Sequence, residues 1–207
     1  MDYHIYRLVY INSMRDAVRQ KAYSGEGKNP KKRLENKDLM DELKPTIDHM
    51  INSVLQNSFK SQTEYNTAFL NATIIVCDII NRNKQNHFKF GNAQKLINMI
   101  IKYFYILSYN NNDIRKGFKY CHCPMDEQLL ENVWKEKTKL KNTDCLGERD
   151  SFLKSWGKED FDIIDGERKI PLRYTSFQNA VKELAKKEII DGRASIALEY
   201  DFIKWGT

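Results

Sequence analysis

The chain has 207 residues, of which 41% are hydrophobic and 30% are charged, a balance that excludes a disordered chain and fits one globular domain. Lys and Arg (34) outnumber Asp and Glu (28), so the formal net charge is +6. This excess favours a polyanionic partner, although a Lys- and Asn-rich composition produces it equally well.

The N-terminal stretch MDYHIYRLVYINSMRD lacks the basic region and the uninterrupted apolar region of a signal peptide. No stretch of the chain is apolar over the length needed to span a bilayer. We therefore expect an intracellular, cytoplasmic protein with no membrane partner. Reduced thiols are expected at all four cysteines, which are Cys77, Cys121, Cys123 and Cys145.

Apolar residues recur with helical spacing along the first half of the chain. Helices are expected over residues 3–23, 38–56, 63–81 and 92–107. The third is apolar almost all round and should lie in the core, and Pro45 lies near the start of the second or kinks it. Between the first two helices, the segment SGEGKNPKKR is expected to be a solvated connection, and it carries the basic residues Lys28, Lys31, Lys32 and Arg33.

A polar loop, SYNNNDIRKGFKYCHCP, separates these helices from the second half of the chain. Pro124 is expected to begin a helix that reaches about Lys137, with Asp126 in its first turn. Residues 144–172 are expected to be irregular, with a hairpin around Asp165-Gly166, and helices over 176–190 and 195–205 follow. The fold class is therefore mainly α: a compact multi-helix domain spanning 1–207, with N-terminal helices in 1–85, a central part in 86–140 and C-terminal helices in 173–205.

The segment CHCPMDEQ contains three residues of metal-binding type, Cys121, His122 and Cys123. A structural zinc site needs two ligand pairs, and the sequence offers no second pair. A Cys–His nucleophile is disfavoured because adjacent side chains on an extended chain point to opposite faces. We expect neither a metal nor a catalytic cysteine here.

The stretch FGNAQKLIN, residues 90–98, places Lys95 near the start of a helix, where the macrodipole is already positive. The amides of the turn at Gly91 form a candidate seat for a DNA phosphate, because helix N-termini bind anions. Further along, Pro124-Met125-Asp126 opens the next helix. A lysine and a carboxylate brought together at such a seat form a chemical pair.

At these residues the chain resembles the helix-hairpin-helix DNA glycosylases that also cleave abasic sites. Those enzymes carry a Gly-x-Gly-x-Lys hairpin, often followed by a small residue and Asn, and a Pro-Val-Asp or Val-Asp at the start of the next helix. Residues 91–95 with Asn98 fit the first element, and residues 124–126 fit the second. The resemblance covers residues 86–134 and predicts a helix-hairpin-helix element there.

Three features depart from the family pattern. The second hairpin glycine is Ala93, the histidine that often follows the aspartate is Gln128, and the spacing between Lys95 and Asp126 is long. No four-cysteine cluster follows the aspartate, which excludes the iron–sulfur branch and leaves no cofactor. An ordinary amphipathic helix boundary is the alternative interpretation of these residues.

The resemblance implies base excision from duplex DNA through a Schiff base. Lys95 is the implied nucleophile, and Asp126 the residue that stabilises positive charge on the sugar. The implied DNA contacts are Gly91, Asn92, Ala93, Gln94 and Asn98. Trp134, Trp156, Trp205, Tyr103 and Tyr105 could enclose a flipped base, but each fits the core equally well and none is assigned.

Two other functions fit the same sequence. One is a non-catalytic helical module that binds nucleic acid or a protein, with Lys95 as a phosphate contact only. The other is an enzyme that acts on a nucleotide or on another modified-DNA substrate. Gln94, Asn98 and Lys102 form a polar stripe on one helix, which either faces solvent or lines a cleft.

Overall fold

The computed structural model describes residues 3–18, 37–82, 87–108, 112–190 and 192–204, and these are mainly helical, as the apolar spacing predicts. The basic residues of the 19–36 connection lie outside the described residues. In the first half the helices are α1 (Tyr3–Ala17), α3 (Lys37–Leu55), α4 (Gln62–Asn81) and α5 (Phe90–Leu107). None of the described helices is long and apolar enough to cross a membrane.

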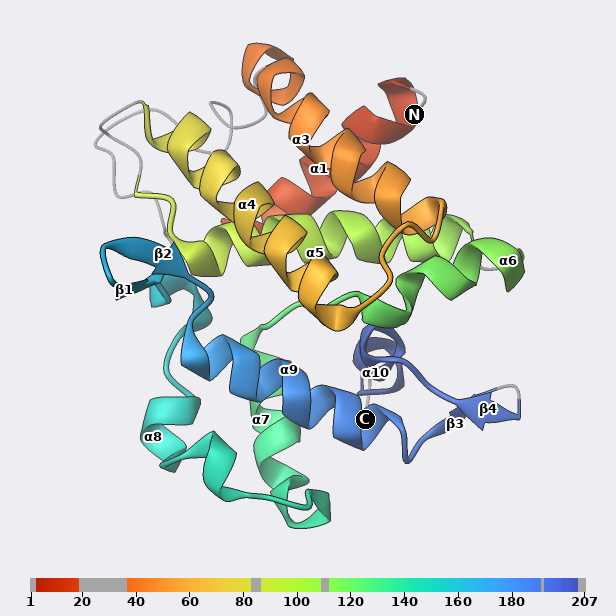
Figure 1. Cartoon of the computed structure of the whole chain (residues 1–207), viewed down its shortest axis with the longest axis vertical. Coiled ribbons are helices and arrows are strands. Elements are labelled where there is room, and N and C mark those ends of the chain that lie inside the picture. Colours follow the sequence, from red (N-terminus) through yellow and green to blue (C-terminus); the bar gives the residue numbers. More distant parts are fainter. Residues whose placement is uncertain (1–2, 19–36, 83–86, 109–111, 191, 205–207) are drawn as a thin grey trace.

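The second half consists of shorter elements (Figure 1). Its α-helices are α6 (Asn112–Arg115), α7 (Glu127–Lys135), α8 (Arg149–Phe152), α9 (Leu172–Ala185) and α10 (Ala197–Lys204). Its 3-10 turns are η1 (Lys116–Tyr120), η2 (Lys137–Lys139), η3 (Asp144–Leu146) and η4 (Trp156–Lys158). Two small antiparallel pairs complete it, β1 (Asp162–Ile164) with β2 (Glu167–Lys169) and β3 (Ile189–Ile190) with β4 (Arg193–Ala194).

Helix α5 lies between the two halves of the molecule. Figure 1 shows α1 and α3 above it, α4 crossing in front of it, and α7, α9 and α10 below it. Every residue from Phe90 to Lys102 is buried, including the polar ones, because the helix is covered on both sides. The buried apolar side chains of both halves form one continuous core. Polar groups on α5 must therefore find partners inside the protein.

The hairpin expected at Asp165-Gly166 is confirmed. Strands β1 and β2 pair with Ile164 opposite Glu167, and the two residues between them have φ of 53° and 77°. A two-residue turn with positive φ at both positions matches the twist of the flanking strands, and Asp-Gly is a favoured sequence for it.

Several predicted helix boundaries are wrong. Helix α1 ends at Ala17, short of the expected end at residue 23. Helix α7 begins at Glu127 rather than at Pro124, because the Asp126 side chain caps it and the backbone of Asp126 is extended. Helix α9 begins at Leu172, one turn before Ser176, since Pro171 provides its N-cap carbonyl. It also ends early, at Ala185, and Ile189–Ile190 form β3 instead of a last helical turn, because Gly192 (φ 75°) allows the chain to reverse.

Candidate active site

Lys95 and Asp126 form an ion pair. Lys95 lies in the second turn of α5, and Asp126 is the residue immediately before α7. Lys95 Nζ is 2.7 Å from Asp126 Oδ2, although 31 residues separate the two along the chain. The two side chains are therefore in contact, as the motif requires, and their catalytic role stays a prediction.

Asp126 uses its two carboxylate oxygens for different purposes. Oδ1 accepts a hydrogen bond of 2.9 Å from the backbone N–H of Leu129, which caps α7. Oδ2 is left for Lys95. Because a cap fixes the side-chain rotamer, the carboxylate that meets the lysine is already oriented before any ligand arrives.

The Lys95–Asp126 pair lies at the wall of a cleft of about 600 Å³. The side chains are only 9% and 19% exposed, and both line this cleft. Its other lining residues are aromatic or apolar (Met99, Tyr103, Ile106, Trp156 and Phe202) or charged or polar (Asp16, Lys102, Glu127 and Gln128). Of the charged or polar ones, Glu127 and Gln128 are exposed at its edge. The cleft is thus a partly apolar space with a charged pair on one side, the usual composition of a small-molecule site.

Two aromatic rings lie close to lysine amines in this cleft. The centroid of the Trp156 ring is 5.9 Å from Lys95 Nζ, and that of Phe202 is 4.7 Å from Lys102 Nζ. Trp156 comes from η4, which packs against the start of α5, whereas Phe202 comes from α10. Residues far apart in sequence therefore enclose the same space.

A second buried pair, Lys102 with Asp201, lies two helical turns along α5 from the first. Lys102 lines the cleft, and Asp201 is almost fully buried beside it. Burial raises the pKa of Asp201, and the neighbouring Lys102 opposes this effect. Within the part of the chain that the structure describes, Asp201 Oδ1 has no hydrogen-bond partner.

The five predicted DNA contacts are all buried in the protein. The amide of Gly91, the expected seat for a phosphate, donates instead to the carbonyl of Glu159 at 3.0 Å. The Asn92 side chain bonds the backbone of Ala17 and of Lys89, which joins the end of α1 to the start of α5. These residues have partners within the chain, and their contact with DNA stays a prediction.

The remaining members of that set, Gln94 and Asn98, belong to a buried hydrogen-bond network. Gln94 bonds the backbone of Met125, and Asn98 bonds Gln94 and the hydroxyl of Tyr174. Of the polar stripe seen in the sequence, only Lys102 reaches the cleft. Gln94 and Asn98 instead satisfy polar groups between the two halves of the molecule.

The residues of the CHC segment face the interior. Burial raises the pKa of the thiols of Cys121 and Cys123 and lowers that of His122 well below its usual range. Both thiols, like that of Cys77, are free. Among the described residues, no group of three or more His, Cys, Asp or Glu side chains could hold a metal ion.

The sequence reasoning missed Lys102 with Asp201 and left Trp156 and Tyr103 unassigned. Lys95 and Lys102 are seven residues apart, so their shared helix face was available from spacing alone. Nothing local indicated Asp201 or Phe202, which the fold brings from the end of the chain. Comparison of the chain with protein-family models, curated proteins and solved structures finds no match.

Proposed function

We propose that this protein is a DNA glycosylase with abasic-site lyase activity, acting on a nucleotide flipped into the α5–α7 cleft. The single observation that supports this most directly is the 2.7 Å contact between Lys95 Nζ and Asp126 Oδ2 at the wall of that cleft. An amine nucleophile needs a neighbour that takes its proton, and a carboxylate at hydrogen-bond distance is such a neighbour.

In the proposed reaction Lys95 passes a proton to Asp126 and attacks the anomeric carbon of the sugar. The new C–N bond forms as the glycosidic bond breaks, and the departing base takes the electron pair of that bond and the proton held by Asp126. The Asp126 carboxylate, charged again, stabilises the positive charge on the sugar and its new ammonium. It then takes a proton from that ammonium, the freed nitrogen lone pair expels the ring oxygen, which receives this proton, and a Schiff base remains on Lys95.

The aromatic walls of the cleft suit an extruded base. A flipped base loses its stacking in the duplex, and stacking on aromatic side chains compensates for this loss. Trp156, Tyr103 and Phe202 supply such surfaces around the two lysines. A free nucleotide would use the same walls, so the two hypotheses differ only in whether the substrate is a DNA duplex or a single nucleotide.

Two carboxylates besides Asp126 line the cleft, the exposed Glu127 at its edge and the partly buried Asp16. Carboxylates repel phosphates, so this edge weakens the binding of a DNA backbone that passes near it. Neutralising the edge should therefore tighten DNA binding without changing the chemical step.

Borohydride trapping on a duplex that contains an abasic site tests the proposal. Borohydride reduces the Schiff base to a stable amine, and peptide mapping of the adduct identifies the lysine. Wild type should give an adduct at Lys95, and Lys95→Gln should give none. Lys102→Gln is the matched control, because it removes the other amine of the cleft from the same helix and should still trap.

Asp126→Asn separates charge from structure at the same site. Asn is an equally good helix cap, so α7 should still form, although the loss of the carboxylate partner of Lys95 should lower stability. Its trapping rate should nevertheless fall by roughly 100-fold, because it loses the group that accepts the lysine proton. No adduct from wild type, or an adduct that maps to Lys102, contradicts the proposal, and salt-sensitive binding without trapping then favours the non-catalytic module.

A further inference from the structure

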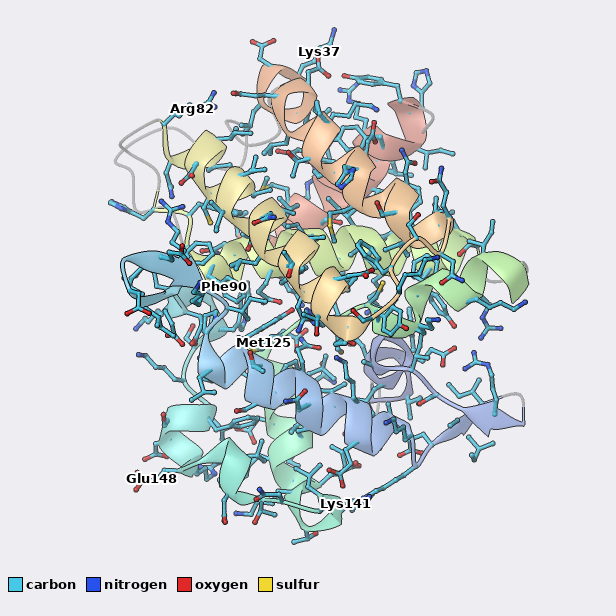
Figure 2. All side chains as sticks on the ribbon, in the orientation of Figure 1. Lys37, Arg82, Phe90, Met125, Lys141 and Glu148 are labelled. Carbon is cyan, nitrogen blue, oxygen red and sulfur yellow. The ribbon has the colours of Figure 1, made fainter. Side chains whose placement is uncertain are left out.

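The position of Asp126 depends on its own cap of α7 and also on how the segment before α7 is held. Residues 122–125 belong to no helix or strand, yet residues 121–125 are buried. Two glutamine side chains supply the missing partners. Figure 2 labels Met125, which lies in the interior of the molecule at this point.

Gln94 holds Met125 by both of its backbone groups. The Gln94 Nε2 donates to the Met125 carbonyl at 3.0 Å, and the Met125 N–H donates to Gln94 Oε1 at 3.2 Å. Gln178 on α9 holds Cys123 in the same way, at 2.7 Å and 2.9 Å. A side-chain amide that pairs with both groups of one residue fixes that peptide as a neighbouring strand would.

The orientation of the Gln94 amide is itself determined. Asn98 Nδ2 donates to Gln94 Oε1 at 3.1 Å and to the Tyr174 hydroxyl at 2.8 Å. The Tyr174 hydroxyl lies 3.1 Å from Nδ1 of His122, whose Nε2 lies 3.0 Å from Asn66 Oδ1. Because burial keeps His122 neutral, one of its ring nitrogens donates a hydrogen bond and the other accepts one.

The side-chain amide of Gln94 can therefore adopt only one orientation. Its oxygen accepts from Asn98 and Met125, so its nitrogen must face the Met125 carbonyl. Rotating the amide by half a turn would bring donors against donors at two places. Pairing with both backbone groups of Met125 therefore holds the Gln94 amide in a single orientation.

We propose that Gln94 is the positioning residue of the Lys95–Asp126 pair. Gln94 is next to Lys95 in α5, and it holds the backbone of Met125, which is next to Asp126. The catalytic consequence of this inference rests on the proposed function, but the contact between Lys95 and Asp126 can be measured without a substrate. Gln94 touches neither the cleft nor the reacting atoms, since it does not line the cleft. It fixes the distance between two elements, α5 and α7, that each contribute one member of the pair.

Gln94→Met tests this role, and Gln178→Met is its matched control. Both variants keep an unbranched side chain of similar length and lose two hydrogen bonds to one buried peptide. Each should therefore lower stability by a similar amount, on the order of 1–3 kcal/mol for each backbone group left unpaired. Only Gln94→Met removes the bonds next to Asp126.

Two measurements on each variant decide the question. In a crystal structure of Gln94→Met, the Lys95 Nζ to Asp126 Oδ2 separation should exceed about 4 Å, the limit of an ion pair. The single-turnover trapping rate at saturating DNA should fall by roughly 10- to 100-fold, because a misplacement of about 1 Å costs that much, while the Kd for the abasic duplex stays within about threefold. Gln178→Met should retain both the contact and the rate.

A Gln94→Met protein with the pair in contact and the wild-type rate overturns the inference, as does a Gln178→Met protein that loses the rate to the same extent. Absence of trapping by wild type would instead count against the proposed function, and the structural arm would still decide the role of Gln94. Should Gln94→Met fail to fold, Gln94→Glu is measured in the same way, because it keeps the acceptor for the Met125 N–H and loses only the donor to its carbonyl.

Discussion

Replacing Gly91 by Ala tests how closely the second half of the chain approaches α5. A Cβ at Gly91 would lie 2.9 Å from the carbonyl carbon of Trp156 and closer still to its oxygen. Ordinary carbon–carbon contacts begin at about 3.5 Å, so η4 must withdraw by more than about 0.5 Å. The withdrawal also strains the bond from the Gly91 amide to the Glu159 carbonyl.

Helix propensity alone predicts that Gly91→Ala stabilises the protein, but the close approach of Trp156 makes the substitution destabilising. Inside a helix, Ala is about 1 kcal/mol more favourable than Gly. Overpacking a close contact costs roughly 1–3 kcal/mol, and here the contacting atoms are backbone, which cannot rotate away. Taking the upper end of that range, about 3 kcal/mol, and subtracting the gain of about 1 kcal/mol, we expect Gly91→Ala to be less stable than wild type by about 2 kcal/mol in urea denaturation.

The same substitution should impair the cleft, because Trp156 forms one of its walls beside Lys95. Gly117→Ala is the matched control: its Cβ would lie 2.9 Å from the carbonyl carbon of Val54, and neither residue lines the cleft. Both variants should lose stability, but only Gly91→Ala should slow borohydride trapping. A Gly91→Ala protein that is more stable than wild type would refute the reasoning from the close approach.

Three further predictions concern charged groups. Burial alone would raise the pKa of Glu199, but hydrogen bonds from Arg193, Tyr105 and others lower it from 4.5 to about 2. Glu199→Gln should therefore cost about 3 kcal/mol at pH 7, and the difference from wild type should vanish as the pH falls from about 4 to about 2. Burial lowers the pKa of Lys182 to about 8, so Lys182→Met should be more stable than wild type at pH 7 and lose that advantage between about pH 8 and 10.5. At the cleft edge, Glu127→Gln should tighten binding to duplex DNA several-fold at low salt.

Denaturation curves at several pH values check the first two of these, and a binding titration at two salt concentrations checks the third. A Glu199→Gln protein whose deficit does not depend on pH would show that the carboxylate charge is not what stabilises α10. A Lys182→Met protein less stable than wild type at pH 7 would contradict the burial cost assigned to that amine. Unchanged affinity in Glu127→Gln would place the DNA backbone far from the cleft edge.

The helices and the hairpin follow from local rules. Apolar spacing predicted every long helix, because a helix that packs on a core must repeat its apolar residues with the helical period. Asp165-Gly166 predicted a turn because few sequences accept positive φ at two successive residues. The errors lie at helix ends, where Asp126 and Pro171 act through single hydrogen bonds that periodicity does not register.

By itself the sequence also indicated that Lys95 and Asp126 belong together, since each lies at a helix start in a recognisable motif. Only the tertiary structure decided how they meet, at 2.7 Å beside a cleft. It likewise showed that Gly91 and Gln94, which the sequence suggests as DNA contacts, have hydrogen-bond partners within the protein. The physical reason is that α5 is covered on both sides: burial is a property of the assembled fold, and the pattern of one helix cannot reveal which of its polar residues will find their partners in another.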